Sequence, residues 1–102
     1  MSTLHTVNKS PFERSNLQAC LGHAQNGDSV LLIEDAVFAA IAGNTFAPKL
    51  ADAAQDIKLF VLGPDLKARG MDPAKVVDGV NIIDYEGFVD LAAASSTIHS
   101  WL

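Results

Sequence analysis

The apolar positions of this chain fall into short runs that alternate between two patterns. One is the continuous apolar run of a strand covered on both faces, and the other is the one-sided apolar stripe of a helix. The pattern predicts strands at 3–7, 29–33, 57–62 and 80–83, with a last edge strand at 98–102. Strands that alternate with helices predict a three-layer α/β/α sandwich around a mostly parallel sheet of four or five strands.

Helix signals fill the segments between these strands. Ser10 as N-cap, Pro11 at the first helical position and Glu13 closing a capping box predict the start of the first helix. Its apolar face is predicted to hold four residues: Leu17, Cys20, Leu21 and Ala24. Further helices are predicted at 34–41, 48–54 and 65–69 and after an Asp84 cap, the last with one stripe of Tyr85, Phe88, Val89 and Ala92.

The length and charge of the chain limit its functional class. A chain of 102 residues forms one domain, here 1–102, with room for a core of its own. The formal net charge is −5 and the seven basic residues are scattered, which argues against direct contact with nucleic acid. Only 19% of the residues are charged, which suggests that other chains cover part of the surface.

The sequence gives no sign of export or membrane insertion. A single cysteine cannot form an internal disulfide. The first residues lack the basic and apolar regions of a signal peptide, and the longest apolar runs are too short to cross a bilayer. We therefore expect a soluble, cytoplasmic protein that does not contact membranes.

Cys20 is the candidate nucleophile, and two roles are open to it. It shares the apolar helix face, and free cysteines are among the most frequently buried residues. It also lies about ten residues into the predicted helix, too far from the amino end for the dipole to lower its pKa. His23, three positions on, could pair with the thiol and favour the thiolate. Cys20 is therefore either a persulfide carrier with His23 as partner, or an inert packed thiol.

No cofactor or metal site is predicted. The chain has neither a Walker A motif nor a GxGxxG motif, so a nucleotide-binding role that would use Lys9 has little support. His5, His23 and His99 do not show metal-ligand spacing, and His5 is interpreted as a structural histidine inside a strand. Trp101 is apolar near the end of the chain and fits either a docking role or packing within the subunit.

Four sequence blocks resemble the DsrH/TusB family over essentially the whole chain. They are Leu-His-Thr-Val-Asn-Lys-Ser-Pro-Phe from position 4, Val-Leu-Leu-Ile-Glu-Asp-Ala-Val-Phe-Ala-Ala from 30, Val-Leu-Gly-Pro-Asp-Leu-Lys-Ala-Arg-Gly from 61 and Ile-Asp-Tyr-Glu-Gly-Phe-Val-Asp-Leu from 83. Because Cys20 is present, the chain resembles DsrH of sulfur-oxidising bacteria more than TusB of the tRNA-thiolation relay.

The resemblance implies a subunit rather than a free-standing enzyme. It implies DsrE-like and DsrF-like partners, two copies of each chain in a cytoplasmic heterohexamer, and a DsrC/TusE-like carrier that receives persulfide sulfur. The main sulfur-bearing cysteine is then expected on the DsrE-type chain, so the role of Cys20 stays open. The leading hypothesis is a sulfurtransferase subunit in sulfur oxidation. The alternatives are a non-catalytic assembly subunit with an inert Cys20, and a TusB-like component of tRNA wobble-uridine 2-thiolation.

Overall fold

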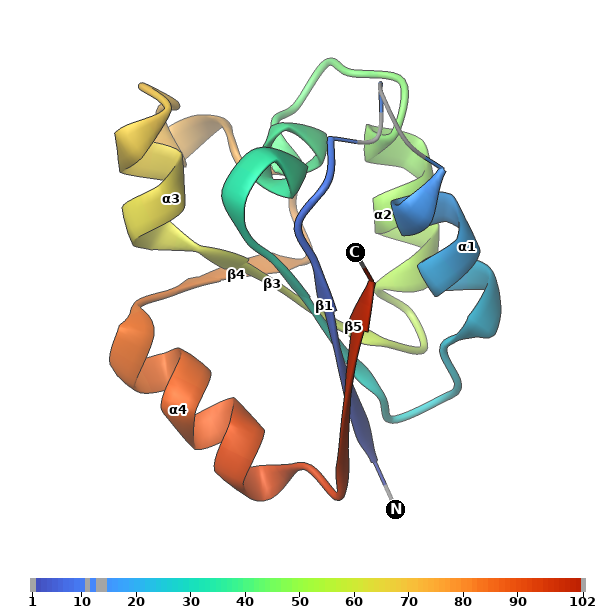
Figure 1. Cartoon of the computed structure of the whole chain (residues 1–102). Helices are drawn as coiled ribbons and strands as arrows, with labels where there is room; N and C mark the ends of the chain where they lie inside the picture. The colour runs from blue at the N-terminus through green and yellow to red at the C-terminus, as the bar shows by residue number, and fades with distance from the viewer. Residues whose placement is uncertain (1, 11, 13–14, 102) are drawn as a thin grey trace.

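Five parallel strands form one sheet, as the computed structural model shows for residues 2–10, 12 and 15–101 (Figure 1). The strands are β1 (Thr3–Val7), β2 (Ser29–Leu32), β3 (Lys58–Leu62), β4 (Val80–Ile83) and β5 (Thr97–Trp101). Their order across the sheet is β4-β3-β2-β1-β5, and every neighbouring pair is parallel. The predicted fold class is confirmed.

The order of the strands determines which face each connection covers. The chain steps outward from β1 to β4 through the helical elements α1 (Asn16–His23), η1 (Glu34–Ala40), α2 (Ala47–Ala53), α3 (Gly63–Ala68) and η2 (Pro73–Lys75). It then returns through α4 (Tyr85–Ala94) to place β5 beside β1. Because parallel crossovers are right-handed, the returning connection lies on the opposite face from the outward ones. Figure 1 shows α4 apart from α1 and α2.

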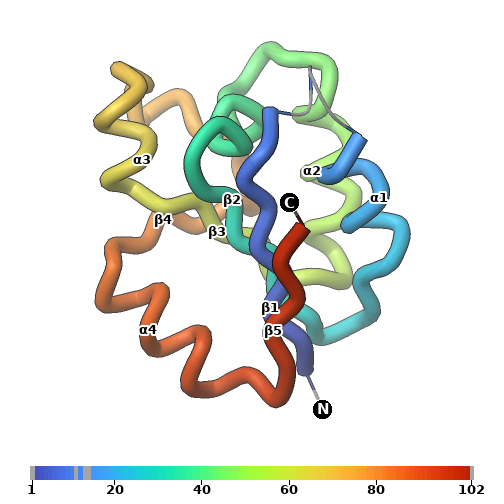
Figure 2. The backbone as a smooth tube through the Cα atoms, viewed as in Figure 1, coloured from blue at the N-terminus to red at the C-terminus, as the bar shows by residue number. Residues whose placement is uncertain are grey.

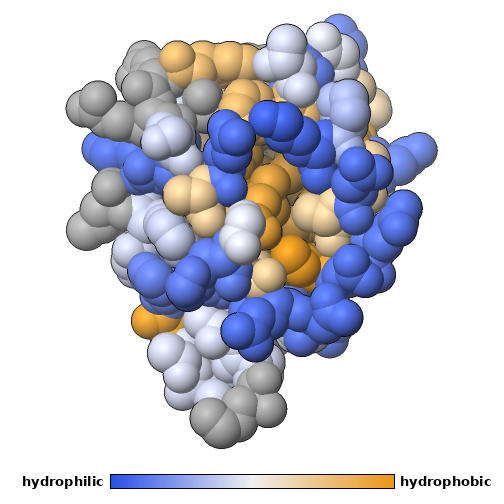
Figure 3. Space-filling model, turned by 90° about the vertical axis from the view of Figure 1, so that its right-hand side faces the viewer, coloured by the Kyte–Doolittle hydropathy of each residue, from blue (hydrophilic) through white to orange (hydrophobic). Residues whose placement is uncertain are grey.

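Alternating side chains of the strands build two apolar clusters. The larger one joins Val7, Val30 and Val61 to the helices of the outward connections. The smaller one joins Leu4, Leu31 and Leu62 to the inner side of α4. On the side of the molecule that carries α1 and α2, apolar side chains lie in a hollow surrounded by polar ones (Figure 3). Across the described residues, no helix combines the length and the apolar composition that crossing a bilayer requires.

The structure corrects two helix predictions. The first helix begins at Asn16, so Cys20 is its fifth residue and lies closer to the amino end than expected. Ser10 accepts a hydrogen bond from the Phe12 backbone N–H at 3.2 Å, whereas the roles predicted for Pro11 and Glu13 fall outside the described residues.

The second correction concerns the stripe of α4. Phe88 and Ala92 pack on the smaller cluster as predicted, but Tyr85 and Val89 are 60% and 65% exposed. The Asp84 cap is confirmed, since its Oδ1 accepts the Gly87 N–H at 2.9 Å. The inner face of α4 is completed by Leu91, which the predicted stripe omitted.

Candidate functional site

Cys20 lies on the inward face of α1 and is fully buried in the larger cluster. Removal from water disfavours the charged thiolate, and the nearby Asp28 carboxylate disfavours it further. Together they raise the pKa of Cys20 to about 12. The thiol therefore stays protonated at neutral pH in this conformation, and a protonated thiol is a poor nucleophile.

His23, the proposed partner of this thiol, faces a group of aromatic rings. It is the last residue of α1 and is exposed. Its ring centroid lies 5.8 Å from Trp101, 6.0 Å from His99 and 6.3 Å from His5, each edge to face. No hydrogen bond joins the Cys20 thiol to the His23 ring among the contacts of the described residues.

His5 is at the centre of this ring cluster, which we define as His5, His23, His99 and Trp101. It is 2% exposed and uses both ring nitrogens. Trp101 Nε1 donates to His5 Nδ1 at 3.1 Å, and His5 Nε2 lies 3.0 Å from Asp28 Oδ2. An indole N–H can only donate, so Nδ1 is the acceptor and the proton of neutral His5 is on Nε2. The prediction of a structural histidine is confirmed, and Trp101 selects its tautomer.

Asp28 precedes β2 and receives hydrogen bonds from three segments. Besides His5, the backbone N–H of Gln25 donates to Oδ2 at 3.0 Å and that of Thr3 donates to Oδ1 at 3.1 Å. Burial by itself opposes ionisation of Asp28. The hydrogen bonds from Gln25, His5 and Thr3 outweigh it, so the pKa of Asp28 lies below its ordinary value. Asp28 is thus an ionised acceptor that ties the start of β1 to the turn after α1.

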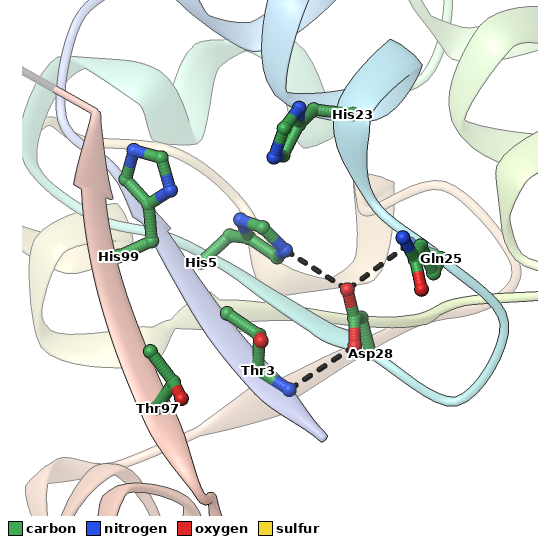
Figure 4. A pocket seen from close by; sticks show the side chains of 7 residues that line it. All are labelled: Thr3, His5, His23, Gln25, Asp28, Thr97 and His99. Atoms are coloured by element: carbon green, nitrogen blue, oxygen red, sulfur yellow. Dashed lines mark hydrogen bonds and ion pairs between the residues drawn. The ribbon is translucent and has the colours of Figure 1, made fainter. Parts of the chain in front are cut away.

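A polar pocket of about 260 Å³ opens beside these residues (Figure 4). Its lining comes from the start of β1, the end of α1, the turn before β2 and the start of β5: Thr3, His5, His23, Gln25, Asp28, Thr97 and His99. It lies at the amino ends of the strands, whereas ligands of open α/β sheets are expected beyond the carboxyl ends. Within the described part of the chain, no group of three or more His, Cys, Asp or Glu side chains is arranged to hold a metal ion.

At the carboxyl ends, the carboxylates are engaged in local structure. Asp65 Oδ2 accepts the backbone N–H of Glu34 at 2.6 Å, and Asp35 pairs with Arg69 at 3.0 Å. Glu34 has φ of +50°, a left-handed conformation that Asp65 stabilises through this hydrogen bond.

None of the sequence patterns described above pointed to Asp28, so its role as an acceptor was missed. The signal that could have revealed it is strand parity. His5 pairs with Val30 in the β1–β2 register, so Asp28, two residues before Val30, lies on the same sheet face as His5. The same reasoning applies to Trp101, because β5 places it opposite Val7 on that same face.

Comparisons with known proteins find relatives along nearly the whole chain. A family model described as "DsrH like protein" matches residues 9–98. The proteins named TusB from Pectobacterium parmentieri and Shigella flexneri are each 36% identical over 98 residues, covering 96% of this chain and 99% of theirs.

Two solved structures share the fold. The crystal structure of the ychN protein from E. coli matches with a TM-score of 0.81 at 18% identity, over 98% of this chain and 99% of that one. A protein of unknown function from Methanobacterium thermoautotrophicum, MTH1491, matches with a TM-score of 0.67 at 16% identity, over 96% of each chain.

Proposed function

Because this chain belongs to the DsrH-like family, we propose that it is a TusB-like subunit of a cytoplasmic sulfur-relay complex. The observation that carries the proposal is the identity of 36% to proteins named TusB along nearly the full length of both chains. It supports the TusB-like alternative better than the leading hypothesis of a DsrH-type subunit in sulfur oxidation. In this proposal the relay serves tRNA wobble-uridine 2-thiolation, as the resemblance to TusB implies.

The chain contributes structure to the complex rather than a sulfur-bearing group. Burial of Cys20 and its pKa of about 12 support the inert role of this thiol. His23 is engaged with aromatic rings, which supports a packing role over activation of the thiol. The sulfur-bearing cysteine then belongs to a DsrE-like partner, with a DsrF-like chain and a DsrC/TusE-like carrier completing the relay. The net charge of −5 fits a subunit that does not hold tRNA itself.

Reconstitution tests this proposal. The chain is co-expressed with the DsrE-like and DsrF-like subunits of its own organism and analysed by size-exclusion chromatography with light scattering. We expect one complex that contains all three chains, with the mass of two copies of each. A chain that elutes alone beside its partners would contradict the proposal.

A persulfide assay tests the role of Cys20 within that complex. After incubation with a persulfide donor, intact-mass spectrometry should find added sulfur on the DsrE-like chain and none on this one. Cys20→Ala should leave sulfur transfer to the carrier unchanged. As a matched control, an alanine at the sulfur-bearing cysteine of the DsrE-like chain should abolish transfer.

The presence of Cys20 favours a second candidate, a DsrH-like subunit that relays sulfur itself. There, the Cys20 thiolate would attack the outer sulfur of a donor persulfide, the donor would leave as a thiolate, and Cys20 would pass the outer sulfur to an acceptor thiolate. This needs an opening of α1 that exposes the thiol. One added sulfur on this chain, absent from Cys20→Ser, would favour this candidate over the first.

A further inference from the structure

β5 forms one edge of the sheet and leaves one side of its backbone without a strand partner. Among the described residues it pairs only with β1, along five residues from Thr97 to Trp101 (Figure 2). Strands of parallel sheets are ordinarily buried on both faces. The residues at 97–100 are exposed instead. The strand is therefore accessible both at its edge and on its faces.

The composition of β5 lacks the features that normally protect an exposed edge. Natural edge strands use charged residues, proline or bulges to prevent pairing with another chain. Residues 97–101 contain no Lys, Arg, Asp, Glu or Pro, and their register with β1 is continuous. β4, at the other edge, has four residues with Asp84 directly after it and Asp78 shortly before it. β4 itself also contains no charged residue, but these carboxylates flank it, whereas residues 91–101 around β5 contain none.

The two faces of β5 differ in the side chains they would accept from an added strand. Ile98 is 52% exposed on the face that α4 covers, so an apolar neighbour there would remove it from water. His99 is on the other face, beside the pocket that it lines with His5 and His23.

Unlike His5, which pairs with Asp28, the imidazoles of His23 and His99 have no carboxylate partner among the described residues. Asp28, the carboxylate of the pocket, already accepts three hydrogen bonds. The side chains of His23 and His99 form no hydrogen bond among those found in the described residues. A carboxylate on the added strand would supply the missing acceptor.

We propose that β5 is a docking edge that pairs through main-chain hydrogen bonds with an extended strand of a sister subunit. That strand places an apolar residue beside Ile98 and an acidic residue toward His99. The identity of the occupant as a sister subunit rests on the function proposed above. The location of the contact rests on the open edge and the side chains of β5.

Hydrogen exchange on the reconstituted complex tests the location. Within 97–101, the amides that point away from β1 should exchange at least tenfold more slowly in the complex than in the isolated chain. Amides of β4, the opposite edge, serve as the internal control and should change less than twofold.

Two matched substitutions test the edge directly. Ile98→Lys puts a charge on β5, and Ile82→Lys puts the same charge on the partly exposed Ile82 of β4. Circular dichroism should confirm that both variants fold. Ile98→Lys should weaken assembly at least tenfold, while Ile82→Lys should weaken it less than threefold.

The outcomes separate the two proposals. A complex that forms without protection of 97–101, or that tolerates Ile98→Lys as well as Ile82→Lys, overturns the docking edge and leaves the proposed function standing. Pairing of β5 with β5 of a second copy, seen as a homodimer that Ile98→Lys dissociates, also overturns it. Failure of the sister subunits to assemble with this chain overturns the proposed function and the docking edge together.

Discussion

Replacing Asp28 by alanine and by asparagine should separate the loss of all three of its hydrogen bonds from the loss of one. Asp28→Ala removes the acceptor for three donors: His5 Nε2, Gln25 N and Thr3 N. The His5 donor is buried, and an unsatisfied buried donor costs about 1–3 kcal/mol. The two backbone donors are partly buried and can recover water from the adjacent pocket, so each loses about 0.5–1 kcal/mol. We expect Asp28→Ala to lower the free energy of unfolding by about 3 kcal/mol.

Asp28→Asn should lower the free energy of unfolding by less than Asp28→Ala, because Trp101 determines how the new amide is oriented. Since the Trp101 indole holds His5 with its proton on Nε2, the amide oxygen must face His5 and Gln25. The amide NH₂ then faces the Thr3 N–H, and this one hydrogen bond is lost. We expect a loss of about 1 kcal/mol, the usual contribution of a single hydrogen bond.

Urea unfolding of the two variants measures this ordering. The free energies should follow wild type, then Asp28→Asn, then Asp28→Ala, with an unchanged denaturant slope. Asp90→Ala, at an exposed position of α4, is the control and should stay within about 0.5 kcal/mol of wild type. If Asp28→Asn destabilises the chain as much as Asp28→Ala, or if neither differs from Asp90→Ala, the reasoning about the Asp28 hydrogen bonds is refuted.

The pH dependence of the same variants checks the sign of the Asp28 shift. A carboxyl group whose pKa is lowered in the folded state stabilises the fold above its unfolded pKa, and loses this contribution as the pH falls through the folded value. The ordinary pKa of the group is 3.8. The stability advantage of wild type over Asp28→Asn should therefore be constant near neutral pH and should shrink below about pH 3.8. An advantage that grows on acidification would contradict the lowered pKa.

Three further predictions concern burial. Because Cys20 is fully buried, a disulfide reagent such as Ellman's should label it slowly in buffer and rapidly in denaturing urea, and equal rates would contradict its burial. The pKa of Cys20 rises from 9.0 to about 12 on folding. The contribution of its protonated thiol to the stability of the wild type should therefore be fully present below pH 9 and should decline as the pH rises from 9 toward 12. Cys20→Ala should show a smaller decline in a urea series across this range. Leu17→Ala, at a buried position of α1, should lower the free energy of unfolding by about 2–5 kcal/mol. Val89→Ala, on the exposed side of α4, should change it by less than about 1 kcal/mol. Similar losses in the two variants would argue against the assigned helix faces.

The sequence predicted the sheet well because strand signals are local. The strand at 80–83 and the first strand were predicted with the observed bounds. The starts of the helices were predicted less accurately. A serine that precedes a proline is a local cap signal, but the tertiary structure decides at which residue the helix begins. Ser10 makes its local hydrogen bond to Phe12, yet α1 begins at Asn16.

The candidate site depended on contacts that a sequence pattern cannot show. Trp101 and His5 are 96 positions apart, and only the pairing of β5 with β1 brings them together. Strand order decides that pairing, and the sequence left strand order open. Cys20 was placed on the inward face correctly, but the presence of His23 three positions on gave no information on where that ring points.

The position of β1 inside the sheet has a consequence for synthesis of the protein. β1 is made first, and one of its two neighbours, β5, is made last. While the ribosome is still translating the middle of the chain, β1 is an unpaired edge strand of the growing sheet, and His5 lacks its hydrogen-bond donor Trp101. In the nascent chain, this edge of β1 therefore stays open to pairing with other strands until residues 97–101 have been synthesised and have paired with β1.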